Sequence, residues 1–217
     1  MAHLVRRASL TLVAALNTPA ALAAFAADHP GVRVDTLPAN LGKAEAVRHG
    51  LRLARRGGAT RVGYCDADFS TPATEVVRLA ELAAAHPELA VVFGARLALL
   101  GRTIERSAFR HAGGRLFAAG AARVLCMPVH DTQCGAKVLR GDATLDAALG
   151  TAFRSRWAFD VELLGRLRGL GVPAAAMWEE PLREWRDVAG SKRSVTDAVR
   201  ATLELAPIAV DLRRKDR

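Results

Sequence analysis

The stretch RVGYCDADFSTP, residues 61–72, decides the fold of this chain. A short β-compatible run ends at two carboxylates, Asp66 and Asp68, and a turn containing Pro72 then opens a helical pattern over residues 73–85. Ligands of open α/β sheets bind at the carboxyl ends of parallel strands. The sequence therefore predicts a binding site directly after this strand.

The two carboxylates admit two interpretations. Carboxylate oxygens suit Mg²⁺ or Mn²⁺, which proteins hold with one or two carboxylates together with the phosphates of a substrate. The functional hypothesis is a divalent metal at Asp66 and Asp68 that binds a diphosphate. The alternative is that Asp68 begins an Asx turn and Asp66 is a solvated charge, because Asp-x-Asp alone is a weak pattern.

Strand-like and helix-like segments alternate on both sides of this stretch. The alternation predicts an α/β fold with a mostly parallel sheet covered by helices on both faces. We expect strands at residues 9–16, 32–37, 61–65 and 90–95, and helices at about 19–27, 42–56 and 73–85.

The pattern changes after Gly101, where a long basic helical segment follows. Its arginines recur at mostly helical spacing, for which a solvated face is the simplest explanation. We expect a helix at 102–125, a strand after the turn at 131–137, a helix start at 156–164, a strand within 174–185, and a final amphipathic helix at 194–212 that is broken or kinked near Pro207. Residues 1–193 then form one domain, followed by this helix and a basic tail at 194–217.

Composition limits the classes of function. The chain has 217 residues, a formal net charge of +9 and only 5% aromatic residues. The positive charge favours anionic partners. The sequence has no basic stretch interleaved with aromatic residues, which argues against nucleic acid as the partner. The three cysteines, Cys65, Cys126 and Cys134, lack the spacing of a zinc site. We therefore expect reduced thiols in a cytoplasmic protein.

The uncharged stretch at residues 10–27 needs a separate interpretation. It has the length of an export signal or a membrane span, but Asn17, Thr18 and Pro19 interrupt it. We interpret it as a buried strand followed by a helix, with an export signal as the alternative. No other stretch has the length and hydrophobicity to span a bilayer.

Several motifs in a fixed order resemble those of the family 2 glycosyltransferases, in the branch that makes polyprenyl-phosphate sugars. The dolichyl-phosphate β-glucosyltransferases are the nearest group. The resemblance runs from about Val32 to Ser194. Its blocks are NLGKA (40–44), DAD followed by STP (66–72), GAR (94–96), Arg106-Ser107 with Arg110, DTQCGAK (131–137), WAFD with Glu162 (157–162), and GSK (190–192).

The resemblance implies a GT-A, Rossmann-like fold and an inverting transfer of a hexose from a nucleotide-sugar such as UDP-glucose. Asp66 and Asp68 would hold Mg²⁺ or Mn²⁺ and with it the diphosphate, whose charge grows as the sugar leaves. Lys43, near a helix start, would contribute to binding the nucleotide phosphates, and Lys192 would close over a phosphate from its loop.

The acceptor in this branch is a polyprenyl phosphate, which is already an anionic nucleophile. Arg96, Arg106 and Arg110 are candidates for its phosphate, because guanidinium groups match phosphate oxygens. Asp160 matches the position of the family's catalytic carboxylate and would orient a substrate or act as base. The sugar or acceptor pocket would be shaped by Asp131, Gln133 and Trp157.

The chain departs from the family at its N-terminal side. Family members open with two strands whose acidic loops bind the base and ribose, and the segment before Val32 is too short for both. If residues 12–18 match the second strand, its two aspartates have become Ala14 and Ala15. Membrane segments that accompany many relatives are also missing, so a lipid acceptor would be reached by peripheral docking at the inner face of the membrane.

Two functional hypotheses follow from these observations. The first is a metal-dependent glycosyltransferase acting on a polyprenyl phosphate or another acceptor. The second is a catalytically silent domain of the same fold that binds a nucleotide, a lipid phosphate or a partner protein. The retained carboxylates, arginines and Lys192 favour the enzyme, and the missing base-binding acids favour the silent domain.

Overall fold

The protein is described from a computed structural model, which places residues 10–14, 24, 27–29, 31–68, 70–105, 108–187 and 202–215. Within these, residues 10–14, 108–112 and 213–215 are described by their secondary structure alone. Of the predicted functional residues, Arg106 and Lys192 lie outside the described ranges, and Arg110 is described only as part of a helix.

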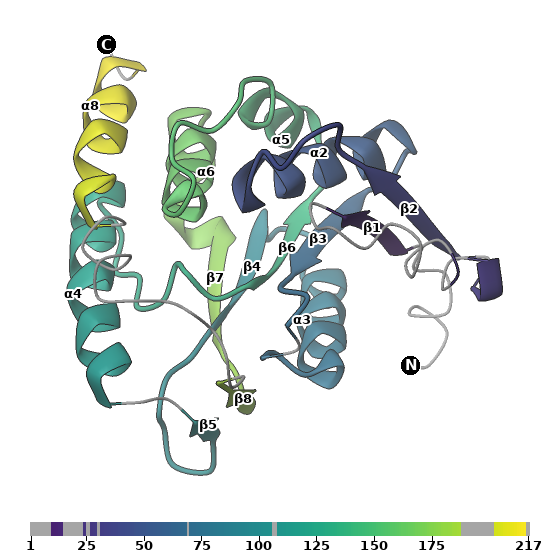
Figure 1. The fold of residues 1–217 in the computed structure, drawn as a ribbon. Helices are drawn as coiled ribbons and strands as arrows, with labels where there is room; N and C mark the ends of the chain where they lie inside the picture. Colours follow the sequence, from purple (N-terminus) through teal and green to yellow (C-terminus); the bar gives the residue numbers. More distant parts are fainter. Residues whose placement is uncertain are drawn as a thin grey trace.

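A four-stranded sheet forms the centre of the fold (Figure 1). Its strands are β3 (Arg61–Cys65), β4 (Val91–Ala95), β6 (Ala136–Arg140) and β7 (Met177–Pro181), in the spatial order β3-β6-β4-β7. β6 is antiparallel to both of its neighbours, whereas β7 is parallel to β4. Three of the four strands therefore point the same way, which confirms the mostly parallel sheet and adds one reversed strand that local patterning did not predict.

Two smaller sheets flank the central one. β1 (Leu10–Ala14) pairs in parallel with β2 (Val32–Thr36), and β5 (Thr103–Glu105) pairs in parallel with β8 (Glu184–Arg186). A single 3₁₀ turn, η2 (Ala174–Ala176), leads into β7. Among the described residues, β1 is the only strand before Val32.

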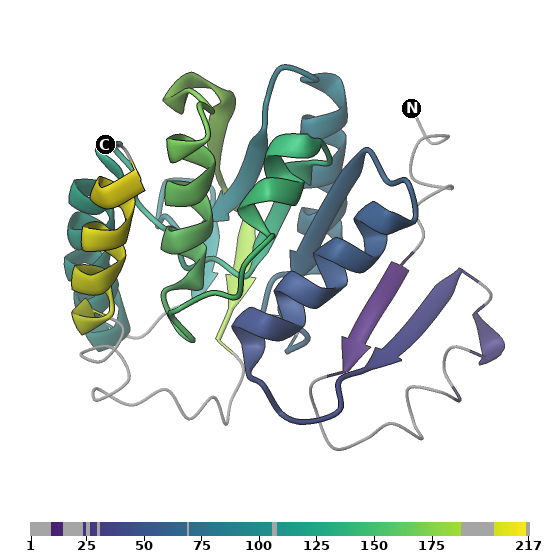
Figure 2. The same cartoon turned by 90° about the horizontal axis from the view of Figure 1, so that it is seen from above.

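Helices cover both faces of the central sheet, as Figure 2 shows from above. Alternate residues of β4 separate the two faces: Val91 and Phe93 join the larger hydrophobic cluster, and Val92 joins the smaller one. The larger cluster lies under α2 (Lys43–Arg56), α4 (Ala108–Leu125), α5 (Ala143–Ala148), α6 (Phe159–Gly169) and α8 (Leu205–Lys215), and the smaller under α3 (Ala73–Ala85). Because both faces are covered, every residue of β4 is buried.

One sequence prediction about the later helices was wrong in its starting residue. The segment expected to be helical from residue 102 begins instead with β5, and α4 starts only at Ala108. The final helix was expected to be broken or kinked near Pro207, and it is interrupted close to that residue: residues 202 and 203 are helical, Glu204 is a turn, and α8 begins at Leu205 with Pro207 as its third residue. Proline is tolerated in a first helical turn, where its missing N–H would have no intrahelical partner.

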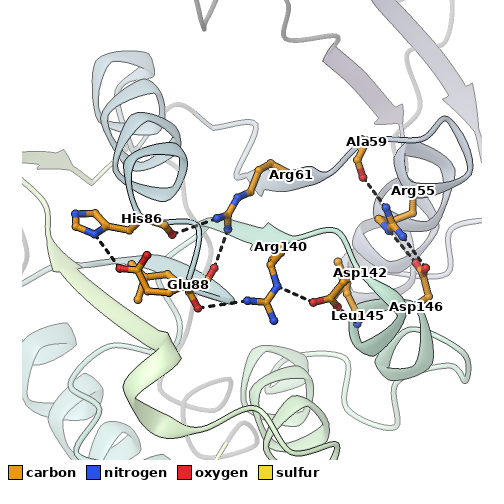
Figure 3. Close-up of polar contacts among 10 residues, drawn as sticks. Arg55, Ala59, Arg61, His86, Glu88, Arg140, Asp142, Leu145 and Asp146 are labelled. Carbon is orange, nitrogen blue, oxygen red and sulfur yellow. Dashed lines mark hydrogen bonds and ion pairs between the residues drawn. The ribbon is translucent and has the colours of Figure 1, made fainter. Parts of the chain in front are cut away.

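Arginines close the edge of the sheet where β3 begins and β6 ends (Figure 3). Arg61 and Arg140 are direct cross-strand partners, and burial together with the charge of Arg140 lowers the pKa of Arg61. Arg55 of α2 lies nearby and pairs with Asp146 at 2.7 Å. Further acceptors for the three guanidinium groups are the carbonyl oxygens of Ala59, His86, Glu88 and Leu89 and the carboxylate of Asp142.

A buried arginine fastens α6 to the loop before it. Arg166 donates to the carbonyl oxygens of Ala148, Thr151 and Ala152 at 2.7–2.8 Å and pairs with Glu162 at 2.7 Å. Both side chains are less than a tenth exposed. This group fixes the helix that carries Asp160.

We predict that Arg166→Met destabilises the protein by about 3–5 kcal/mol, because it leaves a buried carboxylate and several carbonyl oxygens without their partner. Urea unfolding followed by circular dichroism measures the effect. The matched control is Arg186→Met, which breaks the exposed pair with Glu184 and should cost less than about 1 kcal/mol. Equal losses in the two variants would contradict the assignment of Arg166 as a buried structural group.

Candidate functional site

The reversed strand β6 brings several of the predicted site residues that the structure describes to one edge of the sheet. β3 and β4 end at this edge and β6 begins there, so the loop at 131–135 lies beside the residues that follow β3. The backbone N–H of Asp66 continues the ladder by donating to the carbonyl oxygen of Gly135 at 2.9 Å. Two of the motif blocks, at 66–72 and 131–137, begin 65 residues apart in the chain but are neighbours in space.

Asp66 is paired with Lys43, and both are partly exposed. Lys43 Nζ lies 2.5 Å from Asp66 Oδ1. Lys43 is the first residue of α2, so the amino end of that helix faces this carboxylate. The preceding Gly42 has a positive φ of 85° and donates its N–H to Asn40 Oδ1.

Gly135 leaves room for the Asp66 carboxylate. A Cβ atom at Gly135 would lie 2.2 Å from Asp66 Cγ and 2.3 Å from Oδ2, which is far inside van der Waals contact. Only glycine therefore allows the loop at 131–135 to pair with β3 while Asp66 keeps its present position.

Asp68 adopts the Asx geometry that was one of the two sequence interpretations. Its Oδ1 accepts the backbone N–H of Ser70 at 3.0 Å, and its side chain is exposed. Within the described ranges no group of three or more His, Cys, Asp or Glu side chains is arranged to hold a metal ion. The carboxylate oxygens of Asp66 and Asp68 are of the ligand type that Mg²⁺ and Mn²⁺ bind together with substrate phosphates.

The second half of the site is the buried pair of Arg96 and Asp131. Arg96 follows β4, and its guanidinium donates through Nε and Nη2 to the two Asp131 oxygens at 2.6 and 2.8 Å, while its backbone N–H also donates to Asp131. Burial opposes the charged form of Arg96, but the Asp131 carboxylate outweighs it and raises the pKa of Arg96. The guanidinium lies over the ring of Trp185, 5.3 Å from its centroid.

The loop that carries Asp131 is held by Glu179 of β7. Glu179 accepts the backbone N–H groups of His130 and Asp131. Further along the loop, Thr132 Oγ1 and Gln133 Nε2 are buried and have no hydrogen-bond partner among the described residues. Burial, reinforced by Asp131, raises the pKa of the Cys134 thiol to about 11, so this thiol stays protonated at neutral pH.

Asp160 lies in the interior, at the start of α6. Its side chain is 3% exposed, and its Oδ1 is 2.7 Å from Lys137 Nζ and accepts the hydroxyl of Tyr64. Burial, and then Asp160 itself, raises the pKa of Tyr64, which therefore stays a hydroxyl donor. Lys137 also donates to the carbonyl oxygen of Cys134 at 2.6 Å.

These pairs meet around the end of β3. Lys43 Nζ lies 5.8 Å from the centroid of Phe159, the residue before Asp160. The charge of Asp66 contributes to raising the pKa of both Tyr64 and Arg96. Trp157, by contrast, is 40% exposed on the loop before α6.

Sequence reasoning missed several residues that hold the site together. The clearest missed signal is Lys137, a lysine inside the apolar strand AKVLR, because a buried lysine requires a partner. Arg156, whose guanidinium would be 3.1 Å from a Cβ at Gly42, had no such local signal. The other missed residues are Tyr64, Gly135, Glu179 and Glu204.

Comparison with known proteins agrees with the sequence resemblance. The family profile described as "Glycosyl transferase family 2" matches residues 16–144. Dolichyl-phosphate beta-glucosyltransferase of Mus musculus is 34% identical over 169 residues, covering 74% of this chain and 49% of the mouse protein. The chain spans about half the length of the curated relatives it matches.

Solved structures share the fold at low sequence identity. Mannosyl-3-phosphoglycerate synthase from Rubrobacter xylanophilus superposes with a TM-score of 0.67 at 17% identity, covering 96% of this chain and 64% of the other. Glucosyl-3-phosphoglycerate synthase from Mycobacterium tuberculosis, in complex with Mn²⁺, UDP-glucose and glycerol 3-phosphate, gives 0.59 at 15% identity, covering 92% and 66%. These likenesses confirm the predicted GT-A fold.

None of the helices in the described ranges combines the length and the hydrophobicity needed to cross a membrane.

We predict that Gly135→Ala displaces the Asp66 carboxylate and weakens binding of UDP in the presence of Mn²⁺ by about tenfold or more. Isothermal titration calorimetry measures the affinity. Gly113→Ala is the matched control, because a Cβ there meets nothing within 4 Å. Unchanged affinity in Gly135→Ala, with the fold intact, would mean that Asp66 takes no part in binding.

Proposed function

The chain belongs to the family 2 glycosyltransferases, and from this premise we propose that it transfers a hexose from a nucleotide-sugar of the UDP-glucose type to an acceptor that carries a phosphate. The observation that carries the proposal is the contact of Lys43 with Asp66 at the end of β3, opposite Gly135. In this contact the Lys43 ammonium group, the Asp66 carboxylate and the amino end of α2 lie together at the place where we expect the diphosphate to bind.

The donor diphosphate is assigned to the space around Asp66, Asp68 and Lys43. Both carboxylates follow β3 directly, and their number suits a divalent cation shared with substrate phosphates. When bound, such a cation would act as a Lewis acid that stabilises the charge developing on the leaving diphosphate. Lys43 would add its own positive charge, moving from Asp66 to a phosphate oxygen.

The acceptor phosphate is assigned to the neighbourhood of Arg96. A guanidinium has five N–H donors, and Asp131 accepts two of those of Arg96. The pair with Asp131 therefore orients the guanidinium, and its other N–H groups serve the acceptor. A polyprenyl phosphate is the acceptor we favour, because the mouse relative is named as a dolichyl-phosphate enzyme. Arg106 and Arg110 extend the same assignment.

The reaction asks for little proton transfer. A phosphate oxygen of the acceptor forms a bond to the anomeric carbon of the hexose, and the bond from that carbon to the nucleotide diphosphate breaks on the opposite face. The attacking group is already an anion, so the main work of the protein is to hold two phosphates in line against their repulsion. The configuration at the anomeric carbon is inverted.

Asp160 acts in this proposal as a positioning residue. Tyr64 and Lys137 both bind its Oδ1 in the interior, which fixes the orientation of the carboxylate at the start of α6. From there it orients the sugar or the acceptor through the neighbouring residues of the loop, including the exposed Trp157. Gln133, whose Nε2 has no hydrogen-bond partner in the part of the chain that the structure describes, is assigned to the same pocket.

A domain that binds a nucleotide without transferring sugar is the second candidate. It is favoured if residues 12–18 match the family's second strand, because Ala14, the last residue of β1, and Ala15 would then stand in place of the two aspartates that bind the base and ribose. Such a domain would bind UDP through its phosphates and show no transfer.

The test is a transfer assay with radiolabelled UDP-glucose and, separately, GDP-mannose, each with Mn²⁺ and a polyprenyl phosphate or 3-phosphoglycerate as acceptor. We expect transfer from one donor, and a loss of about 100-fold or more in Asp68→Asn. Glu81→Gln removes the same charge from the exposed side of α3 and should leave activity unchanged. Binding of UDP without transfer to either acceptor would favour the second candidate.

A further inference from the structure

The residue before α8, Glu204, reaches the loop in front of α6. Its Oε2 accepts the hydroxyl of Ser155 and the backbone N–H groups of Trp157 and Ala158, the last two at 3.2 and 3.4 Å. Three donors from one short loop thus converge on a single carboxylate oxygen. Glu204 lies 42 residues beyond Glu162, the last residue of the sequence block that it supports.

α6 lacks a capping side chain at its own N-cap. The N-cap residue is Ala158, which has no side-chain acceptor, and no side-chain cap is formed there. Ser155 Oγ accepts the N–H of Ala158 at 2.6 Å, and its hydroxyl donates a hydrogen bond to Glu204. A carboxylate at this position also complements the positive amino end of the helix. Glu204 therefore supports from another segment the local acceptor, Ser155, and adds its own contacts to the N–H groups of Trp157 and Ala158.

α8 is packed so that Glu204 has little freedom to leave. Leu205 lies against Gly120 of α4, where a Cβ would be 2.8 Å from its Cδ1. Leu212 lies against Gly165 of α6, where a Cβ would be 2.3 Å from its Cδ1. At these two points the glycines admit the leucine side chains, so α8 is fitted to both helices.

The loop that Glu204 caps leads directly into the proposed site. Trp157 is exposed, Phe159 lies under Lys43, and Asp160 binds Tyr64 and Lys137. A shift of the loop would therefore move the start of α6 relative to the end of β3. The contacts of Lys43 and Asp66 with each other do not involve this loop.

We propose that Glu204 is a positioning residue for the transfer reaction: from its place directly before α8 it caps the start of α6 together with Ser155, and so fixes Trp157 and Asp160 relative to the donor site. The inference rests on the proposed function. It adds that the geometry of the site depends on the position of α8, which holds Glu204 against the loop before α6. Loss of the cap lowers kcat, because the geometry of the reacting groups degrades, while nucleotide affinity stays nearly the same.

The experiment compares the full chain with its Glu204→Ala, Glu204→Gln and Asp211→Asn variants. Asp211 is the matched control, because it lies on α8 and pairs with Arg154 at 2.8 Å without contacting Trp157 or Ala158. Amide hydrogen exchange is read at Trp157 and Ala158, together with kcat, KM and the Kd for UDP with Mn²⁺. The rate of amide hydrogen exchange at these two residues shows whether their hydrogen bonds to Glu204 persist, even if the protein transfers no sugar.

In Glu204→Ala we expect exchange at the two amides to rise about tenfold or more and kcat to fall about tenfold, with the Kd for UDP changed less than about twofold. Glu204→Gln keeps a carbonyl acceptor and should recover most of both losses. Asp211→Asn should match the wild type.

Unchanged exchange in Glu204→Ala, or equal effects in Asp211→Asn, would overturn the inference. Faster exchange with wild-type kcat would also overturn it, since the cap would then be structural alone. A wild-type protein that binds UDP but transfers no sugar would instead refute the proposed function, so the two failures are distinguishable.

Discussion

The antiparallel pairing of β6 with β3 is the constraint on which the site depends. At its last step the N–H of Asp66 donates to the carbonyl oxygen of Gly135, and the missing Cβ of Gly135 is what lets the Asp66 carboxylate stay beside it. The same register places Lys137 opposite Tyr64, and both side chains reach Asp160. A shift of one residue in the register of β6 against β3 would turn the side chains of one strand to the other face of the sheet, and these contacts would be lost.

Three carboxylates around the end of β3 each have a cationic partner. Asp66 is paired with Lys43, Asp131 with Arg96, and Asp160 with Lys137. The first pair is partly exposed, whereas both side chains of the other two are less than a tenth exposed. An exposed pair exchanges partners at little cost, but a buried pair resists separation because each unpaired charge would be poorly solvated. Lys43 is therefore the cation suited to meet an incoming diphosphate, and the buried pairs hold the frame around it.

Much of this arrangement was predictable from local sequence. The strand at 61–65 and the helix at 73–85 have the bounds that their hydrophobic periodicity and Pro72 indicated. The reversed direction of β6 was not predictable in this way, because strand direction depends on pairing and leaves no local signal. β5 was missed because three residues are too few for a period. Glu204 was missed because its role depends on contacts between segments far apart in the chain, which one sequence does not reveal.

The measurement that tests the central claim most directly is a crystal structure of the protein with UDP-glucose and Mn²⁺. The account predicts the diphosphate at the end of β3, with the metal bound to the carboxylates of Asp66 and Asp68 and with Lys43 turned from Asp66 toward a phosphate oxygen. A diphosphate bound instead at the opposite edge, among Arg55, Arg61 and Arg140, with the pair of Lys43 and Asp66 intact, would contradict it.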